Sequence, residues 1–262
     1  MTVDVHTWIG TYPFRDVPHP DPEVLVRVLE REGLSGAWVG HLPSAFWRDP
    51  SSGNDTLFTA VERWPTMLRP VPCIRPGWPH WERALASAVD RDVPAIRAYP
   101  PQWGLAPQDE RLRELALACG EAGVALVLTT RFEDVRQRHW MDSAGDVSGA
   151  AIRALARASD RVQVVVCAAG RALIEEVHWG LTPSERSRVW WDISWIWGPP
   201  EDDLAHLIRT CGAERFVYGT AWPLRLTQTP RANLALLPDD VREATLATAD
   251  AITTRAQLAA AG

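Results

Sequence analysis

Eight short apolar runs alternate along the chain with segments of helical pattern, and this alternation limits the choice of fold more than any other feature. The apolar runs, which are rich in β-branched residues, cover 3–9, 36–40, 68–74, 95–99, 124–129, 162–167, 189–193 and 215–219. Helical patterning covers 22–31, 81–90, 109–122, 150–158 and 200–211. A strand and a helix that repeat about every 30 residues predict parallel strands joined by crossover helices.

Eight such units predict an α/β fold, a single (β/α)8 barrel that spans residues 1–262 as one domain. No Ser/Gly linker or change in composition divides the chain. A helix at 238–258 is expected to close the barrel. An open, doubly wound sheet is the alternative, but the glycine-rich dinucleotide fingerprint is missing after the first strand.

Composition excludes several classes of function. A formal net charge of -6 offers no basic field to a nucleic-acid backbone, and no apolar run approaches the roughly 20 residues of a membrane span. The N-terminal stretch lacks the basic and apolar regions of a signal peptide, so a cytoplasmic protein is predicted. All 27 basic residues are arginines, which excludes Schiff-base chemistry on a lysine, a Walker phosphate loop and a carbamylated lysine between two metals.

The four cysteines are Cys73, Cys119, Cys167 and Cys211, which lie far apart and form no C-x-x-C pair. Neither a zinc knuckle nor a disulfide framework is indicated, and reduced, buried thiols are expected. Cys167 follows a run of valines and is expected to be an inert apolar filler, because no nearby histidine can be assigned to activate it.

Five segments carry a family resemblance. They are D-V-H-T-W-I-G at the first strand, I-R-A-Y-P at the fourth, V-V-V-C-A-A-G at the sixth, W-W-D-I-S-W at the seventh and A-E-R-F-V-Y-G-T-A-W-P at the eighth. Over nearly its whole length the chain resembles the amidohydrolase-related (amidohydrolase 2) family of metal-dependent TIM-barrel hydrolases and decarboxylases. The resemblance implies the barrel fold, with function at the C-terminal ends of the strands.

The resemblance also implies where a divalent metal would be bound, and there the sequence departs from the family. The H-x-H of the first strand is reduced to His6 and Trp8, and the fifth-strand histidine position falls near Thr129. The sixth-strand position falls at Ala168, and the aspartate of the family's G-T-D-W-P is Ala221. One remaining histidine does not supply the three protein ligands that a catalytic zinc takes. Neither a metal nor another cofactor is therefore expected.

Two residues are candidates for catalysis. His6 at the barrel mouth is either a general acid/base freed from metal binding or a remnant whose ring is satisfied in a core. Asp192 shares one strand face with Ser194, as in a D-x-S that supports the site in the family. It is either a base or orienting group, or a buried carboxylate that accepts backbone or Trp N–H hydrogen bonds.

Three arginines, Arg75, Arg97 and Arg131, follow strands three, four and five and are expected to converge on one wall. Arginine binds carboxylate or phosphate bidentately, so an anion site is predicted. Strand alternation places Arg97 on the inward face with Tyr99. The alternative is that each arginine pairs with a loop carboxylate, such as Glu133 or Asp134 for Arg131.

A pocket at the barrel mouth is expected, together with ligand contacts from several aromatic and polar side chains. Its predicted lining is His6, Trp8, Arg97, Tyr99, Thr129, Arg131, Asp192 and Trp222, and Arg75 is predicted to bind substrate as well. The chain has 14 tryptophans, and those in loops serve either as walls of this pocket or as anchors for another protein.

Two classes of function remain open. One is a metal-independent hydrolase or lyase that acts on a small anionic, carboxylate-bearing substrate, with Arg97 and Arg131 holding the carboxylate and His6 or Asp192 moving protons. The other is a non-catalytic subunit or regulator that pairs with an intact homologue or another partner through its Trp-rich surfaces, or forms a homo-oligomer. Neither function involves nucleic acid or a membrane.

Overall fold

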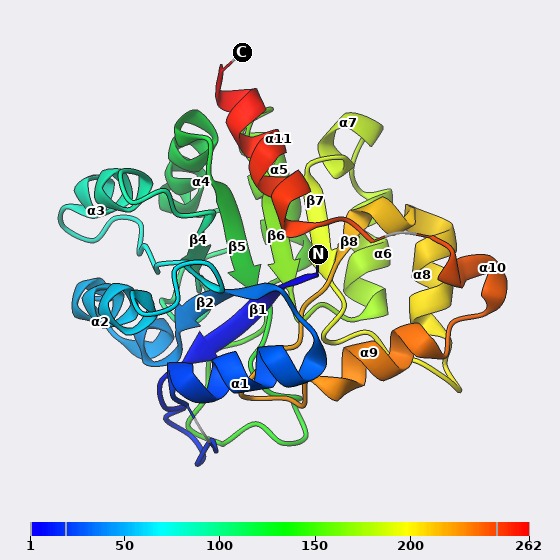
Figure 1. Ribbon diagram of the computed structural model, residues 1–262. Coiled ribbons are helices and arrows are strands. Elements are labelled where there is room, and N and C mark those ends of the chain that lie inside the picture. The colour runs from blue at the N-terminus through cyan, green and yellow to red at the C-terminus, as the bar shows by residue number, and fades with distance from the viewer. Residues whose placement is uncertain (1, 19, 245, 262) are drawn as a thin grey trace.

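Eight parallel strands form the centre of the protein (Figure 1), in a computed structural model that describes residues 2–18, 20–244 and 246–261. The strands are β1 (Val3–Ile9), β2 (Gly36–His41), β3 (Leu68–Pro70), β4 (Ala95–Ala98), β5 (Ala125–Thr129), β6 (Val164–Cys167), β7 (Val189–Asp192) and β8 (Phe216–Val217). The runs expected at 68–74 and 215–219 are therefore only partly strand.

The strands close into a barrel through two backbone bridges. Hydrogen bonding runs in the order β1-β2-β3 and, separately, β4-β5-β6-β7-β8. A parallel bridge between Cys73 and Arg97 joins the segment after β3 to β4. Another between Thr7 and Trp222 joins β1 to the segment after β8. The predicted (β/α)8 barrel is confirmed.

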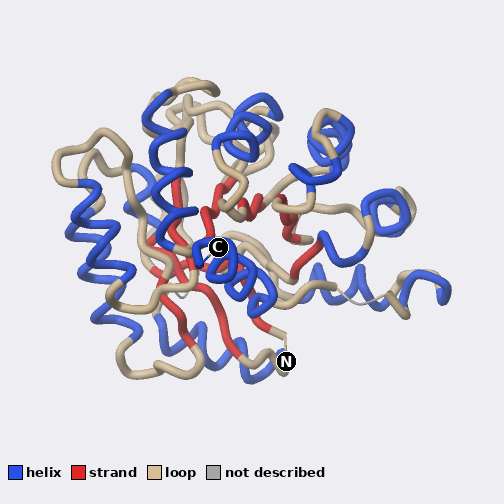
Figure 2. The backbone as a smooth tube through the Cα atoms, turned by 90° about the horizontal axis from the view of Figure 1, so that it is seen from above, coloured by secondary structure: helices blue, strands red, loops and turns tan. Residues whose placement is uncertain are grey.

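Helices surround the strands (Figure 2). They are α1 (Pro22–Glu32), α2 (Ser51–Val61), α3 (Trp81–Val89), α4 (Glu110–Ala122), α5 (Gly149–Ala158), α6 (Arg171–Trp179), α7 (Pro183–Arg186), α8 (Asp203–Cys211), α9 (Gln228–Ala235), α10 (Asp239–Arg242) and α11 (Ala249–Ala261), with 3-10 turns η1 (Leu42–Phe46) and η2 (Ala213–Arg215). Local chemistry sets the limits of α4: the Asp109 carboxylate accepts the Arg111 N–H at its start, and Gly123 ends it with φ 68°.

Apolar side chains fill the barrel near the N-terminal ends of the strands, and α11 covers this end. Val5, Val127, Val165 and Trp190 belong to one buried cluster with residues of α11, among them Ile252. Figure 1 shows α11 at the end of the barrel opposite the arrowheads of β5 and β6. The C-terminal ends of the strands are therefore the free face on which a site can form.

The prediction of a single closing helix at 238–258 is wrong. The described residues form two helices, α10 and α11, and Ala247 between them bridges to Val217 of β8. The Thr248 hydroxyl then caps α11 by accepting the Ala251 N–H. Pairing with the sheet and a new N-cap interrupt the helical pattern. None of the described helices is long and apolar enough to cross a membrane.

Candidate active site

A bulge in β1 turns the side chain of His6 toward the barrel axis. The β1–β2 register shifts between Asp4 and Thr7, so that β1 carries one extra residue. Val5 and His6 both lie within the shifted segment: Val5 packs in the interior cluster, and the His6 ring reaches Asp192 on β7. Bulges re-aim side chains in this way, and here the bulge places an imidazole at the C-terminal end of the barrel.

His6 and Asp192 form a fully buried pair. Nδ1 of His6 lies 2.6 Å from Oδ2 of Asp192 and 3.2 Å from the Ser194 hydroxyl oxygen. Burial lowers the pKa of His6 below 6.5, and the Arg97 and Arg225 charges lower it further, against the opposing effect of Asp192. A neutral ring that donates Nδ1–H to the carboxylate keeps its lone pair on Nε2, which has no partner among the described residues.

Backbone groups hold this pair from two sides. The Ala168 N–H donates to Asp192 Oδ1 at 2.8 Å, and the Ala221 N–H donates to the His6 carbonyl at 2.8 Å. Both alanines are left-handed, with φ 59° and 62°, a conformation that costs a non-glycine residue roughly 1–2 kcal/mol. At Gly219 an added Cβ would lie 2.8 Å from the Asp192 Cβ, so the glycine leaves room for the carboxylate.

Arg97 is buried beside the pair and pairs with no carboxylate among the described residues. Its Nη2 donates to the Val5 carbonyl at 3.3 Å, and its guanidinium carbon lies 5.1 Å from the centre of the Trp8 ring. Nε and Nη1 of Arg97 make no hydrogen bond to the described residues, and neither does the buried hydroxyl of Thr129. A buried cation with free donors is costly unless an anion satisfies it, so the position suits a carboxylate ligand.

An aromatic cap, which we define as Tyr12, Phe14, Phe46 and Phe132, covers the barrel mouth. The Phe132 ring centre lies 5.1 Å from that of Phe46 and 6.1 Å from that of Tyr12. It also lies 5.4 Å from the Tyr99 ring, whose hydroxyl accepts the Trp8 indole N–H at 2.9 Å. Sequence reasoning missed the cap, whose members are dispersed over three loops.

Most of the residues expected to line a pocket at the barrel mouth are buried. Six of its eight predicted lining residues are no more than 1% exposed: His6, Trp8, Arg97, Tyr99, Thr129 and Asp192. The structure does bring these six to the C-terminal half of the barrel interior, but it closes them beneath the cap. Trp222 is partly exposed, and Arg131 pairs with Asp146 at 2.8 Å.

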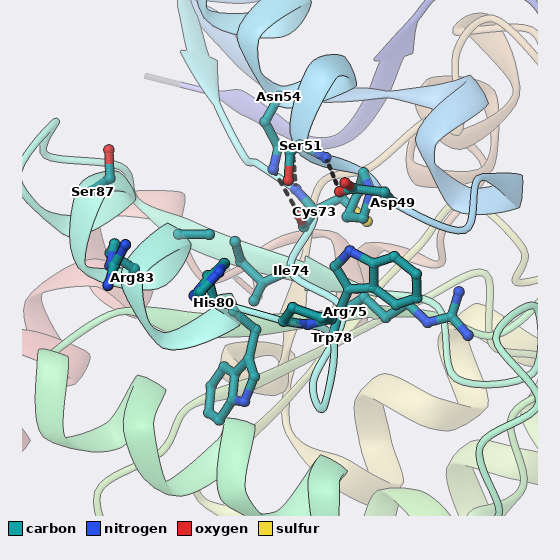
Figure 3. Close-up of a pocket in the computed structure, with 14 residues that line it drawn as sticks. Asp49, Ser51, Asn54, Cys73, Ile74, Arg75, Trp78, His80, Arg83 and Ser87 are labelled. Atoms are coloured by element: carbon teal, nitrogen blue, oxygen red, sulfur yellow. Dashed lines mark hydrogen bonds between the residues drawn. The ribbon is translucent and has the colours of Figure 1, made fainter.

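The three arginines expected to converge lie in separate settings. Arg75 donates to the Arg48 carbonyl at 2.9 Å and lies over the Trp78 ring. It lines a cavity of about 580 Å³ between the start of α2 and α3 (Figure 3). Arg131 lies over the Trp195 ring instead. Arg75 lies five residues beyond the end of β3, and its side chain turns toward Arg48. The order of the strands therefore did not predict where this side chain points.

Arg225, which follows β8 in the segment W-P-L-R, was not among the residues predicted to bind substrate. Its guanidinium carbon lies 4.0 Å from the Trp195 ring centre, and it lines a cavity of about 630 Å³ with Phe132. Burial lowers the pKa of Arg225, and the negative charge of Asp192 acts in the opposite direction.

Arg15 ties three loops together at the edge of the same cavity. Its Nε donates to Glu133 at 2.7 Å and its Nη2 donates to the Leu224 carbonyl at 2.9 Å. These contacts connect the loops after β1, β5 and β8, and they hold the loop that carries Phe132.

The Asp4 carboxylate holds the backbone of β1 and of the segment after β8 together. Its Oδ1 accepts the N–H groups of His6 and Thr220 at 3.0 and 3.1 Å, and its Oδ2 accepts the Thr220 hydroxyl at 2.6 Å. Burial raises the pKa of Asp4 from 3.8 to about 7, although these hydrogen bonds oppose the shift.

We expect Asp4→Asn to stabilise the protein relative to wild type increasingly as the pH rises. Between pH 4 and 7 the folded state retains a proton on Asp4 that the unfolded chain releases, so the contribution of Asp4 to the free energy of unfolding falls with rising pH. An asparagine stays neutral and can donate to the Thr220 hydroxyl. Chemical denaturation of both proteins at pH 5 and pH 8 measures the difference, and a pH-independent difference would contradict the raised pKa.

One group of described side chains comes within metal-ligand distance. Ligand atoms of His6, Cys167 and Asp192 all lie within 4.8 Å of one another. Both Asp192 oxygens already accept hydrogen bonds, one of them from the Ala168 backbone N–H. The Arg97 charge also acts on His6. Ala168 and Ala221 add no side-chain ligand to this group of three.

Comparison with known proteins identifies the fold. No protein-family model matches this sequence, and no curated protein matches it. Among solved structures, an uncharacterized TIM-barrel protein from Bordetella bronchiseptica matches with a TM-score of 0.69 and 16% identity, over 97% of this chain and 99% of that one. The chain is a TIM barrel of the same kind.

Two further structures of this fold have named activities. A 2,6-dihydroxybenzoate decarboxylase from Rhizobium matches with a TM-score of 0.68 and 11% identity, over 98% of this chain and 99% of that one. A probable 2-pyrone-4,6-dicarboxylic acid hydrolase from Acinetobacter baumannii, solved with citric acid bound, matches with a TM-score of 0.56 and 10% identity, over 91% and 96%. At such identities the likeness shows the fold alone, and it confirms the expected TIM barrel.

Proposed function

We propose that this protein is a metal-independent hydrolase or lyase that acts on a small carboxylate-bearing compound. One observation carries the proposal: the buried His6, oriented by Asp192, and the buried Arg97 pack on the same Trp8 ring, at 4.4 and 5.1 Å from its centre, and both keep ring or guanidinium nitrogens free of hydrogen bonds to the described residues. Such a pairing supplies a proton acceptor and an anion-binding group in one water-poor space.

Each residue then has a defined part. Arg97 binds the substrate carboxylate by charge-assisted hydrogen bonds. Nε2 of His6 takes or returns the proton, while Asp192 fixes the tautomer by accepting Nδ1–H. We assign substrate contacts also to Trp8, Tyr99 and Thr129, which are buried, and to Arg131 and Trp222, which are partly exposed. Substrate reaches Arg97 only when Phe132 and its neighbours in the aromatic cap move aside.

Known proteins of this fold support the substrate class. The decarboxylase from Rhizobium is named for a dihydroxybenzoate, and the Acinetobacter protein for a pyrone dicarboxylic acid. Both compounds carry carboxylates on planar rings, which match an arginine beside aromatic side chains. A panel of aryl carboxylates, pyrone carboxylates and citrate, followed by thermal shift and by mass spectrometry of products, tests the proposal. It fails if no carboxylate raises the melting temperature and none is converted.

Metal content gives a separate test. We expect untagged protein to hold far less than one zinc or manganese per chain, because both Asp192 oxygens already accept hydrogen bonds and Ala168 and Ala221 add no side-chain ligand. Elemental analysis measures the content, and turnover before and after dialysis against a chelator measures dependence. About one ion per chain that is lost in His6→Gln, or turnover that is lost on dialysis against the chelator, would overturn metal independence, whereas ions retained in His6→Gln with chelator-resistant turnover lie elsewhere and leave it standing.

A further inference from the structure

Cys167 lies beside the His6–Asp192 pair, although the sequence suggested no histidine near it. It is the last residue of β6, pairs in register with Thr129 on β5, and is fully buried. The register of β6 with β7 pairs Val166 with Trp191, one residue before Cys167 and Asp192. Its sulfur lies within 4.8 Å of a ring nitrogen of His6 and of an Asp192 oxygen.

The other cysteines lack this setting. Cys73, Cys119 and Cys211 are also buried free thiols, but among the described residues only Cys167 forms a group with a histidine and a carboxylate. The His6 Nδ1 is engaged by Asp192, and its Nε2 is buried and makes no hydrogen bond within the described part of the chain. A nucleophile, a base and a group that orients the base are the three parts of a catalytic triad.

We propose that Cys167 is the nucleophile of an acyl-transfer reaction, with His6 as its base, Asp192 as the positioning residue and a carboxylated ester or lactone as substrate. This inference rests on the proposed function and narrows it from hydrolase or lyase to acyl hydrolase. It also gives a role to the Thr129 hydroxyl, which has no partner among the described residues and lies in register beside Cys167.

The proposed reaction has an acylation step and a deacylation step. The Cys167 sulfur attacks the substrate carbonyl and its proton passes to His6 Nε2, while the Thr129 hydroxyl donates to the oxyanion. The carbon–oxygen bond of the ester breaks, and His6 returns the proton to the departing alkoxide, which leaves a thioester on Cys167. Water, deprotonated by His6, then hydrolyses the thioester and restores the thiol.

Burial is compatible with this sequence of steps. Desolvation and the charge of Asp192 raise the pKa of Cys167, so the thiol is neutral in the free protein. The proton therefore leaves during attack, as it does from a serine activated by a histidine. Arg97 acts in the opposite direction on the pKa of Cys167, and its charge favours the thiolate.

The test uses 4-acetoxybenzoate, a carboxylated ester that would transfer an acetyl group. Wild type should acquire the mass of one acetyl group on the peptide that contains Cys167, and hydroxylamine should remove it. Cys167→Ala and Cys167→Ser should lose this adduct and about a thousandfold or more of turnover. Cys119→Ala, which removes a buried thiol in α4, should keep both. Circular dichroism and melting temperature confirm that the variants fold.

The outcomes separate this inference from the proposed function. Turnover that survives in Cys167→Ala but disappears in His6→Gln would overturn the nucleophile and leave the His6–Asp192 chemistry standing. Carboxylate binding without any ester turnover or acetyl adduct would overturn acyl transfer and leave a lyase. An adduct on Cys119 as readily as on Cys167 would show unspecific acetylation and would also overturn the inference.

Discussion

Replacing Arg97 with methionine should weaken binding of a carboxylate ligand roughly tenfold to a hundredfold and leave the fold intact. A charge-assisted pair in a buried space contributes on the order of 1.5–3 kcal/mol. Arg97 is fully buried, and among the described residues only the Val5 carbonyl accepts a hydrogen bond from its guanidinium. Methionine keeps much of the aliphatic stem over Trp8 and removes unsatisfied donors, so the free energy of unfolding should stay level or rise.

The measurement is the shift in melting temperature across a carboxylate series for wild type and variant, followed by calorimetry on the best ligand. Arg75→Met is the matched control, because it removes the same charge from a cavity between α2 and α3 rather than from the barrel. Equal responses of wild type and Arg97→Met would make Arg97 structural. No response of either protein to any carboxylate would favour the subunit role over the enzyme.

The barrel could be predicted because its signal is local. Val164, Val165 and Val166 of β6, for example, are apolar on both faces, as expected of a parallel strand covered by helices on one side and filled inside on the other. Helix α1 likewise has its proline at the start and Gly33 at the end. The closing helix could not be predicted, because the pairing of Ala247 with β8 depends on residues distant in the sequence.

The candidate site could be predicted only in part. Strand alternation predicted the inward direction of Arg97, and strand ends pointed to His6 and Asp192, which the structure brings within hydrogen-bonding distance. The pairing itself depends on the β1 bulge, which no local pattern marks. The same segment of β1 brings His6 near Cys167. Cys167 was expected to be inert because no histidine could be assigned to it, and the sequence does not reveal this long-range neighbour.

Backbone strain marks two positions that support the site. Ala168 and Ala221 stand at positions where the resembled family has metal ligands. Both residues have a left-handed backbone conformation. Their N–H groups hold Asp192 and the His6 carbonyl. A strained backbone persists where the surrounding contacts determine it, so we infer that these two residues are supports of the His6–Asp192 pair.

Replacing Asp192 with asparagine should reduce turnover about a hundredfold to ten-thousandfold while leaving the overall fold in place. The new amide would present a donor or a weaker acceptor to His6, so the ring loses the charge that fixes Nδ1–H and stabilises its protonated form. The amide oxygen can still accept the Ala168 N–H, which preserves the contact to the end of β6. The loss should therefore fall on kcat and on the pH profile rather than on substrate binding.

The control for this variant is Ser194→Ala, which removes the other oxygen near His6 Nδ1, 3.2 Å away, without removing charge. Its turnover should stay within about tenfold of wild type, because a neutral hydrogen bond contributes about 1 kcal/mol. Single-turnover kinetics separate chemistry from product release for all three proteins. If Asp192→Asn keeps the wild-type rate, Asp192 has a purely structural role. The buried carboxylate would then serve only the Ala168 backbone, and proton transfer would have to depend on His6 without an orienting group.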